Sequence, residues 1–271
     1  MRIGFVGCGN MASALARGLG DPIVCSDVDA ARAQALAAEL GGQAVATNAA
    51  VFAAADAIVL CHKPGQLEDV AGDVDAAGKV VLTLLGGVAL ERVRAAYPGA
   101  RVYRFMPNTA VAVQRGAIGL VDDDAGDPGA FEVVRALLER VGEVLVLAEA
   151  HLGIVTATAG VAPAYAALIT EAWIDAAVRR GLPAPQAERL VGAALEGAMA
   201  LLRAQDMDTL AVRRAVTSPG GVTARGLAAL EAGGVRAALD DAMDAVLEGG
   251  ARPRPSSSRR RGPRSPTTCR R

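Results

Sequence analysis

Runs of consecutive apolar residues alternate with Ala-rich amphipathic stretches over roughly the first 150 positions. The apolar runs, which are typical of strands buried on both faces of a sheet, occupy 2–6, 22–26, 57–61, 80–84 and 101–105. Helical patterns lie between them at 11–19, 30–40 and 90–96, and a helix at 128–140 is flanked by strands at 117–121 and 143–147. This alternation predicts βαβ units in a Rossmann-type, doubly wound and mostly parallel α/β sheet over residues 1–150.

The strand pattern ends at Glu149, and the chain is helical in pattern from there to residue 248. One predicted helix covers 163–180, with Pro163 in its first turn and Gly181 after its end, and others cover 184–204, 207–216 and 235–247. Their apolar faces are too long for the surface of a single chain. We therefore expect an all-α domain over 151–248 whose apolar faces are buried between subunits.

One segment of this helical half raises the question of a membrane. Residues 152–170 are 19 positions without a charge, close to the ~20 that span a bilayer. The segment contains Thr156, Thr158, Thr170 and a central Pro163, and its apolar residues are mostly Ala. A helix buried between subunits has the same composition, so we expect no membrane partner, with a transmembrane helix as the alternative.

Composition and charge narrow the possible classes of function. A hydrophobic content of 52% with 21% charged residues excludes wholesale disorder, and 3% aromatic residues leave few stacking platforms for nucleic acid or sugars. Residues 251–271 carry eight Arg and no acid, which leaves 20 basic against 29 acidic residues in 1–250. An acidic body does not suggest nucleic-acid binding.

The end of the chain differs in composition from everything before it. Residues 249–271 are rich in Pro, Ser and Arg without apolar periodicity, which predicts a disordered basic tail. Such a tail either has no function or touches an anionic surface, and its abrupt start is also consistent with read-through in another frame.

The spacing of the four cysteines indicates a reducing cellular compartment. Cys8, Cys25, Cys61 and Cys269 show neither CxxC spacing nor a nearby His pair, so no metal site and no disulfide framework is predicted. The first ten residues lack the pattern of a signal peptide. We expect a cytoplasmic protein.

The sharpest local motif directly follows the first predicted strand and opens a helix. It reads Gly7-Cys8-Gly9-Asn10-Met11-Ala12. The first Gly permits a tight turn, the second lets a pyrophosphate approach the backbone, and the small third residue lets the helix pack on the strand. The motif predicts a dinucleotide-binding domain, and a glycine turn that only closes a βα unit is the alternative.

The end of the second strand normally distinguishes the two nicotinamide cofactors. Asp27 lies 20 residues beyond Gly7, where an acid bonds a ribose diol and repels a 2′-phosphate. Arg32 could instead form an ion pair with a 2′-phosphate, and Asp27 could simply cap a helix starting at Ala30. The cofactor is therefore expected to be NAD(H) or NADP(H), with Asp27 favouring NAD(H).

A lysine stands where doubly wound sheets hold ligands. Lys63 and Pro64 follow the strand at 57–61, at the carboxyl edge of the predicted sheet. The alternative for Lys63 is a solvated loop residue. The adjacent His62 has no obvious Asp partner and is not expected to act as a base.

A second polar cluster lies between two predicted helices in the helical half. Residues 216–223 place Gly220 and Gly221 among hydroxyl side chains, before a helix expected to start at Ala224. Several backbone N–H groups pointing one way form a nest that suits a carboxylate. A capping turn is the alternative, because Ser and Thr cap helices.

Six short motifs, in order and spacing, resemble those of the pyrroline-5-carboxylate reductase family from residue 1 to about 248. They are GCGNM at 7–11, Asn48 at the third helix, HKP at 62–64 (VKP in the family), MPNTA at 106–110 (MPNTP), AGVAPAY at 159–165 (SGSGPAY) and TSPGGVT at 217–223 (TSPGGTT).

This resemblance implies reduction of 1-pyrroline-5-carboxylate to L-proline by hydride transfer from NAD(P)H to C5 of the cyclic imine. It adds Asn48 to the cofactor contacts and makes Thr223 the catalytic hydroxyl near the ring nitrogen. It places the substrate carboxylate on Ser218, Gly221 and Val222, and Glu149 near the ring nitrogen. It also implies an interlocked homodimer that completes the site, with larger oligomers possible.

Departures from the family pattern leave two alternatives. Ala159, Val161 and Ala162 replace Ser, Ser and Gly, Gly153 replaces an Asp, and Ala215 replaces a residue that is often polar. These changes allow a related imine or hydroxyacid dehydrogenase with another substrate, although 151–180 lacks the Lys that β-hydroxyacid dehydrogenases use. A non-catalytic, cofactor-binding regulatory paralogue is the other alternative, and the retained TSPGG and Thr223 argue against it.

Overall fold

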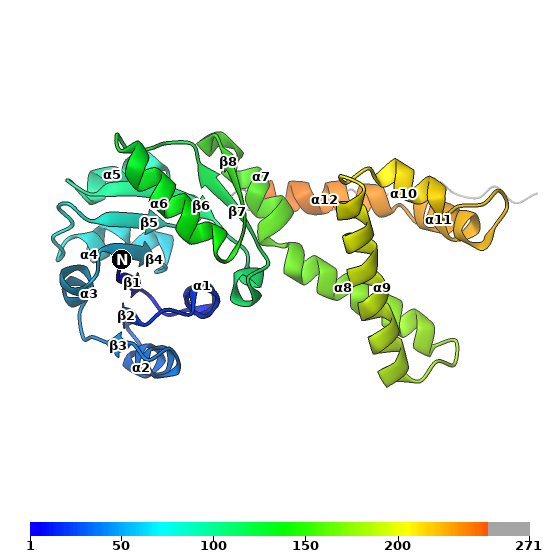
Figure 1. Cartoon of the computed structure of the whole chain (residues 1–271), viewed down its shortest axis with the longest axis horizontal. Helices are drawn as coiled ribbons and strands as arrows, with labels where there is room; N and C mark the ends of the chain where they lie inside the picture. Colours follow the sequence, from blue (N-terminus) through cyan, green and yellow to red (C-terminus); the bar gives the residue numbers. More distant parts are fainter. Residues whose placement is uncertain (249–271) are drawn as a thin grey trace, which may run out of the picture.

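The computed structural model describes residues 1–248; the predicted basic tail, 249–271, lies outside the described residues. The chain has two parts, an α/β part built on a sheet and a helical arm that extends away from it (Figure 1). Helix α12 runs back along the arm to the arm's first helix, α7, where Leu247 would lie 3.6 Å from a Cβ on Gly153.

The sheet of the α/β part has eight strands in the described residues, in the order β3-β2-β1-β4-β5-β6-β7-β8. They are β1 (Ile3–Val6), β2 (Ile23–Ser26), β3 (Gln43–Ala44), β4 (Ala57–Leu60), β5 (Val80–Thr83), β6 (Arg101–Met106), β7 (Gly116–Val121) and β8 (Gly142–Leu147). Neighbours pair in parallel except β6 and β7, which are antiparallel. The predicted doubly wound, mostly parallel sheet is confirmed, and the sequence pattern missed only the two-residue edge strand β3.

Helices cover both faces of this sheet, which explains its runs of consecutive apolar residues. The helices are α1 (Asn10–Leu19), α2 (Ala30–Glu39), α3 (Asn48–Ala54), α4 (Leu67–Ala71), α5 (Leu90–Ala96) and α6 (Pro128–Glu139), with 3-10 turns η1 (Pro64–Gln66) and η2 (Thr109–Val113). Phe5 belongs to the cluster that packs on α1, α2 and α6. Val6, the next residue, packs with α3, α4 and α5 on the opposite face, as alternation along a strand requires.

The arm is helical throughout, as predicted. It comprises the 3-10 turn η3 (Glu149–His151), α7 (Leu152–Val155), a π-helical turn (Thr156–Gly160), α8 (Ala162–Val178), α9 (Ala184–Ala204), α10 (Thr209–Ala215), α11 (Val222–Ala232) and α12 (Val235–Leu247). The helix expected at 207–216 starts later because Asp206 and Met207 have positive φ and Asp208 caps α10. The helix expected from Ala224 starts at Val222.

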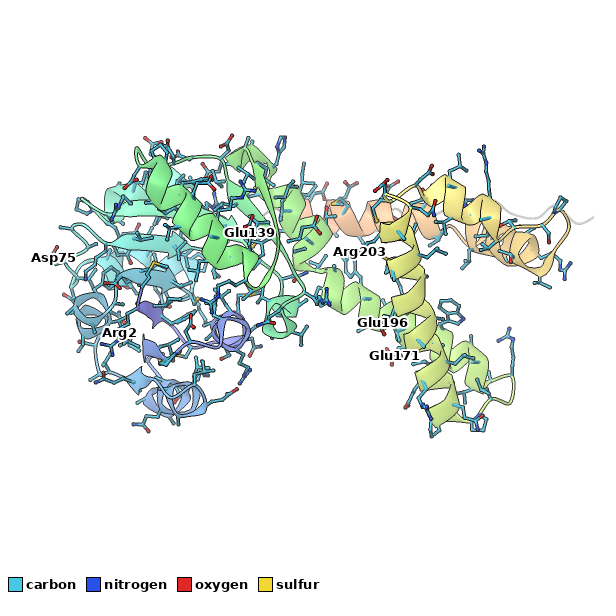
Figure 2. The ribbon with its side chains drawn as sticks, viewed as in Figure 1. Arg2, Asp75, Glu139, Glu171, Glu196 and Arg203 are labelled. Carbon is cyan, nitrogen blue, oxygen red and sulfur yellow. The ribbon has the colours of Figure 1, made fainter. Side chains whose placement is uncertain are left out.

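The arm has almost no core of its own. Helices α8, α10, α11 and α12 bury no residue, and α9 buries only Ala187 and Val191. Large apolar side chains are about half exposed or more along it, including Leu168, Ile169, Trp173, Leu190 and Leu239. Figure 2 shows side chains standing out from α8 and α9, among them Glu171 and Glu196. An apolar surface of this extent needs a partner to cover it.

One helical stretch of the described residues is long and apolar enough, by length and composition alone, to cross a membrane. It is Glu149–Val178, 30 residues with a mean hydropathy of 1.7. A single helix of this kind is weak evidence for a membrane, because helices that become buried in soluble assemblies have the same composition.

Candidate functional site

The two glycines of the turn between β1 and α1 have different surroundings. Gly7 has φ +91°, and a Cβ there would lie 2.9 Å from both the carbonyl carbon and oxygen of Cys61. Gly7 therefore lets the turn sit against the end of β4. A Cβ on Gly9 would meet nothing within 4 Å, so the second glycine faces open space.

This open face is shaped for an anion. Gly9 is the N-cap of α1 and supplies no side-chain cap, which leaves the first amides of the helix unpaired within it. A cleft of about 670 Å³ lies over the turn and is lined by Cys8, Gly9, Asn10, Ser13, Ala14, Arg17, Arg32, Thr109 and Ala112. It lies at the carboxyl ends of β1 and β4, where the strand order reverses, so the residues present fit a dinucleotide pyrophosphate.

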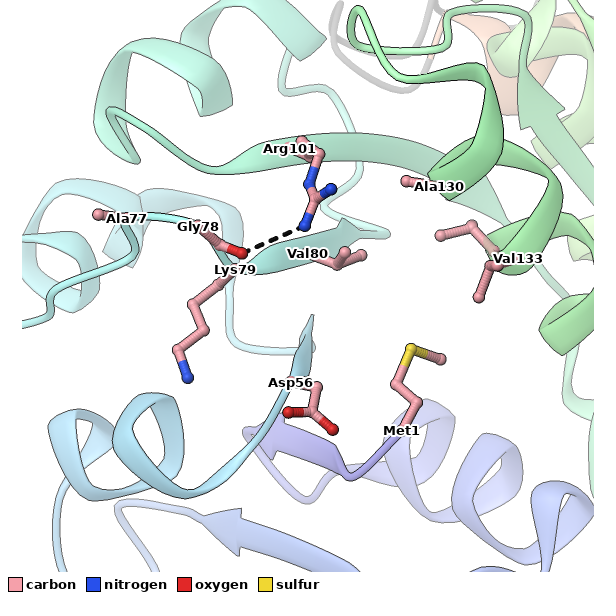
Figure 3. Close-up of a pocket in the computed structure, with 10 residues that line it drawn as sticks. Met1, Asp56, Ala77, Gly78, Lys79, Val80, Arg101, Ala130 and Val133 are labelled. Atoms are coloured by element: carbon pink, nitrogen blue, oxygen red, sulfur yellow. Dashed lines mark hydrogen bonds between the residues drawn. The ribbon is translucent and has the colours of Figure 1, made fainter.

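A second hollow, of about 490 Å³, lies at the other edge of the sheet (Figure 3). Met1, Asp56, Val80 and Arg101 line it, and they stand at the amino ends of the strands. Arg101 donates a hydrogen bond to the Gly78 carbonyl there, at 3.3 Å. Doubly wound sheets hold their ligands at the carboxyl ends, so this hollow is not the candidate site.

Asp27 lies against the glycine turn and is nearly buried, with 6% of its side chain exposed. Its carboxylate accepts hydrogen bonds from the amides of Cys8, at 2.6 Å, and Asp29, at 2.8 Å. The N-cap of α2 is Asp29, which accepts from the amides of Ala31 and Arg32. The alternative that Asp27 caps this helix is therefore wrong.

Asn48 and Lys63 stand at the same edge of the sheet. Asn48 is the first residue of α3, and its Oδ1 accepts a hydrogen bond from the Ser26 hydroxyl at the end of β2, at 2.8 Å. This leaves the Asn48 NH₂ group for another partner. Lys63 is exposed and is the N-cap of η1, which begins at Pro64. The structure thus brings the predicted cofactor residues together.

The side chain of His62 lies beside this cluster and is half-buried. Its Nδ1 lies 3.0 Å from the Lys63 carbonyl, and within residues 1–248 its buried Nε2 has no hydrogen-bond partner. Burial lowers the pKa of His62, because the charged imidazolium loses hydration. A neutral imidazole with an unpartnered nitrogen is able to accept a proton, so the expectation that His62 is not a base stays a prediction.

The glycine turn also covers buried thiols. Cys8 and Cys25 are buried and Cys61 is partly so, and all three are free. The Cys8 thiol donates to the Ser26 carbonyl at 3.6 Å, and the Cys25 thiol donates to the Ala33 carbonyl at 3.4 Å. The neighbouring Cys25 and burial raise the pKa of the Cys8 thiol, and burial raises the pKa of Cys61, so these two thiols pack as small apolar groups beneath the turn.

The TSPGG loop lies in the arm, between α10 and α11. Gly220 has φ +70°, and the Gly221 amide donates to the Ser218 carbonyl at 3.0 Å. Gly221 is the N-cap of α11, without a side-chain cap. The interpretation of Ser218 or Thr223 as the cap of this helix is therefore wrong. Thr223 is the second residue of α11, half-buried, and its hydroxyl makes no hydrogen bond within residues 1–248.

Within one chain this loop does not meet the glycine turn. Helices α10 and α11 lie at the end of the arm that is remote from α1 (Figure 1). Ser218, Gly221, Val222 and Thr223 are therefore together, but separate from the predicted cofactor residues.

Glu149 is also separate from the loop. Its Oε1 accepts from the Leu90 amide at the start of α5, at 2.6 Å, and pairs with the buried guanidinium of Arg104 on β6. These two donors place it at the junction of the sheet and the arm.

Asn108 lies in the MPNTA motif, but the sequence alone does not indicate a role for it. Asn108 is buried, and its Nδ2 donates to the carbonyl of Ala159 in the π-helical turn, at 3.0 Å. Its Oδ1 accepts from the amides of Ala110 and Ala117. Asn108 thus ties the loop after β6 to the start of the arm, and π-helical turns are frequent at functional sites.

Comparison with known proteins assigns both parts of the chain. Residues 149–252 match the family model described as pyrroline-5-carboxylate reductase dimerisation, and residues 2–87 match the model described as NADP oxidoreductase coenzyme F420-dependent. The pyrroline-5-carboxylate reductase of Pseudomonas aeruginosa is 33% identical over 258 residues, covering 91% of this chain and 94% of the relative. That of Corynebacterium melassecola is 35% identical over 201 residues, covering 72% and 74%.

Comparison with solved structures agrees with the match to these relatives. The 1-pyrroline-5-carboxylate reductase of Streptococcus pyogenes superposes with a TM-score of 0.84 at 26% identity, covering 92% of this chain and 97% of that one. The Plasmodium falciparum pyrroline carboxylate reductase, solved with NADP bound, has the same fold (TM-score 0.82, 24% identity, 92% and 96% covered). A reductive aminase from Aspergillus terreus is more distant, with a TM-score of 0.53 at 22% identity over 75% of this chain. This chain belongs to the pyrroline-5-carboxylate reductase family.

Proposed function

We propose that this protein reduces 1-pyrroline-5-carboxylate to L-proline, with NADH or NADPH as the source of the hydride. The observation that carries the proposal is the Thr223 hydroxyl, unpartnered within the described residues at the start of α11, in a chain that matches the Pseudomonas aeruginosa reductase over 91% of its length. In this proposal residues 1–150 hold the dinucleotide, and residues 151–248 supply the substrate loop and the contacts to a second copy.

The residues around the glycine turn hold and orient the cofactor. The open face at Gly9 and the free amides of α1 receive the pyrophosphate, and Asn10 and Met11 form the first turn of that helix. The Asn48 amide, at the start of α3, and the Lys63 ammonium, after β4, bind ribose hydroxyls. The reduced nicotinamide, when bound, supplies the hydride that C5 of the ring accepts.

The TSPGG loop holds the substrate. The Val222 amide, at the start of α11, and the Ser218 hydroxyl bind the ring carboxylate. The Gly221 amide, which the sequence also led us to expect there, already donates to the Ser218 carbonyl at 3.0 Å and holds the turn instead. The Thr223 hydroxyl lies one residue beyond Val222, and its oxygen accepts a hydrogen bond from the N–H of the protonated ring nitrogen as C5 accepts hydride. Such a site needs no strong base, which fits the absence of a role for His62.

A complete site then takes parts from two copies. The loop and the glycine turn of one chain are far apart, and the exposed apolar face of α8 to α12 requires a partner to cover it. We infer a homodimer in which the arm of one copy brings its loop to the glycine turn of the other. The same burial accounts for the apolar stretch Glu149–Val178 without a membrane, and the acidic body and reduced thiols fit a cytoplasmic enzyme that binds no nucleic acid.

The test is turnover of 1-pyrroline-5-carboxylate with each reduced cofactor, alongside other cyclic imines and 2-hydroxy acids. We expect proline formation that depends on enzyme and on NADH or NADPH. The altered segment from Ala159 to Ala162 favours a related imine as the second candidate substrate. Tight cofactor binding without turnover of any imine would instead support a regulatory paralogue.

A further inference from the structure

The loop that joins β2 to α2 is fastened to the glycine turn. Asp27 accepts the Cys8 amide at 2.6 Å and so holds residues 27–29 beside the cleft over that turn. In doubly wound domains this loop faces the 2′ position of the adenosine ribose, where the two nicotinamide cofactors differ by one phosphate. The groups on this loop therefore decide which cofactor fits.

The site that a 2′-phosphate would use is already filled by a carboxylate. The first amides of a helix are natural phosphate donors. At α2 the amides of Ala31 and Arg32 donate instead to Oδ1 of Asp29, at 3.1 and 3.3 Å. A phosphate there would have to displace Asp29 or lie against its negative charge.

The positive charges around this loop do not offset the negative charges of Asp27 and Asp29. The cation beside this loop is Arg32, the third residue of α2, and its guanidinium already lies 3.9 Å from Asp27 and 3.7 Å from Asp29. Arg17, which also lines the cleft, makes two hydrogen bonds to Glu39, at 2.6 and 2.9 Å. Two carboxylates against one shared guanidinium leave the loop with a negative balance, which suits a diol and repels a dianionic phosphate.

We infer that this cleft selects NADH over NADPH, and that Asp29 is the residue that determines the choice. The inference rests on the cofactor class of the proposed function. It moves the preference expected from Asp27 to Asp29, because the Asp27 carboxylate is already bound to the amides of Cys8 and Asp29.

The experiment compares Kd for NADH and NADPH on the full chain by nicotinamide fluorescence, and for 5′-ADP and 2′,5′-ADP by calorimetry. Wild type should bind NADH about tenfold more tightly than NADPH, and the gap should narrow as salt rises. Asp29→Ser removes the charge but keeps a good helix cap. It should reduce the NADH preference about tenfold, mainly through tighter binding of NADPH and 2′,5′-ADP.

A matched control is Asp127→Ser. Asp127 caps α6 through the Ala130 amide at 3.0 Å, far from the glycine turn at the amino edge of the sheet. It should leave both Kd values unchanged. A wild-type preference for NADPH, lost in Arg32→Gln, would overturn the inference, and so would an unchanged ratio in folded Asp29→Ser. If that variant does not fold, the wild-type ratio alone decides.

These outcomes separate the inference from the proposed function. NADH selectivity without turnover of any imine leaves the inference standing and removes the enzyme assignment. Turnover that is faster and tighter with NADPH keeps the enzyme and removes the inference.

Discussion

The carboxylate of Glu149 is paired with the guanidinium of Arg104, and this pair joins the first turn of the helical arm to the sheet. Arg104 is buried on β6, 45 residues before Glu149. The same carboxylate accepts the Leu90 amide and so caps the start of α5. Together with the bond from Asn108 to Ala159, this contact sets the direction in which the arm leaves the α/β part.

Glu149→Gln should destabilise the protein. The amide oxygen can still accept from Leu90, but the buried Arg104 loses its counter-charge. Breaking a buried pair costs about 3–5 kcal/mol, and the partial exposure of Glu149 reduces the expected loss to about 1–3 kcal/mol. Urea unfolding in the absence of cofactor measures it.

Glu143→Gln is the matched control. Glu143 pairs with Arg203 at 3.7 Å, and both side chains are largely exposed; Arg203 is labelled near the end of α9 in Figure 2. Its loss should change stability by less than about 0.5 kcal/mol. Equal unfolding curves for the two variants would show that the Arg104 pair does not secure the arm.

Gly9→Val should abolish cofactor binding and leave the fold intact. The Gly9 backbone has φ −72° and ψ −173°, which a β-branched residue adopts without strain. Its side chain would project into open space where the pyrophosphate is placed. Circular dichroism should be unchanged, while the fluorescence enhancement of NADH and NADPH on binding should disappear.

Gly7→Val provides the contrast. Its side chain would meet the Cys61 carbonyl at 2.9 Å in a left-handed backbone conformation, so this variant should lose stability as well as binding. If Gly9→Val bound the cofactor normally, the proposal that the pyrophosphate lies over this turn would be wrong.

Thr223→Ala should lower turnover without lowering stability. Losing a hydrogen bond to a charged group costs about 1.5–3 kcal/mol, or roughly 10- to 150-fold in rate. Since Gly221 caps α11, no cap is lost with the Thr223 hydroxyl, and the melting temperature should stay close to that of wild type.

Thr223→Ser keeps the hydroxyl and should retain most of the rate. Steady-state kinetics and cofactor Kd on both variants complete the test, with Kd expected to be unchanged. Wild-type turnover in Thr223→Ala would eliminate the catalytic role.

Mixing Gly9→Val, which should be inactive, with the slow Thr223→Ala tests whether the site is shared between copies. If each site combines the glycine turn of one chain with Thr223 of the other, co-expressed Gly9→Val and Thr223→Ala chains form heterodimers with one intact site. Random pairing then restores roughly a quarter of wild-type activity. A mixture no more active than its components would place both groups in one chain.

The arm itself should be needed for assembly. Leu168→Glu puts a charge on its exposed apolar face and should yield monomers by light scattering, with turnover lost and cofactor Kd retained. Val133→Glu, at similar exposure on α6, should remain dimeric. A dimeric, active Leu168→Glu would mean that this face is not covered by the second copy.

The pattern of residues along the chain determined much of the secondary structure of this protein. The consecutive apolar residues of Ile3–Val6 predict a strand buried on both faces, because alternate side chains enter the Phe5 and Val6 clusters. The bounds of α9 and α12 follow from their periodicity and flanking residues alone. The glycine turn was predictable because its conformation depends on residues adjacent in the chain.

The partners of polar side chains were decided only by the tertiary structure. Asp27 and Asp29 both precede α2 and either could cap it, but only packing against the glycine turn commits Asp27 to Cys8 and leaves the cap to Asp29. Glu149 meets Leu90 and Arg104 because the strand order brings β6 and α5 to the root of the arm. Backbone conformation and the spacing of apolar positions depend on neighbours along the chain, whereas these contacts depend on how distant elements are stacked.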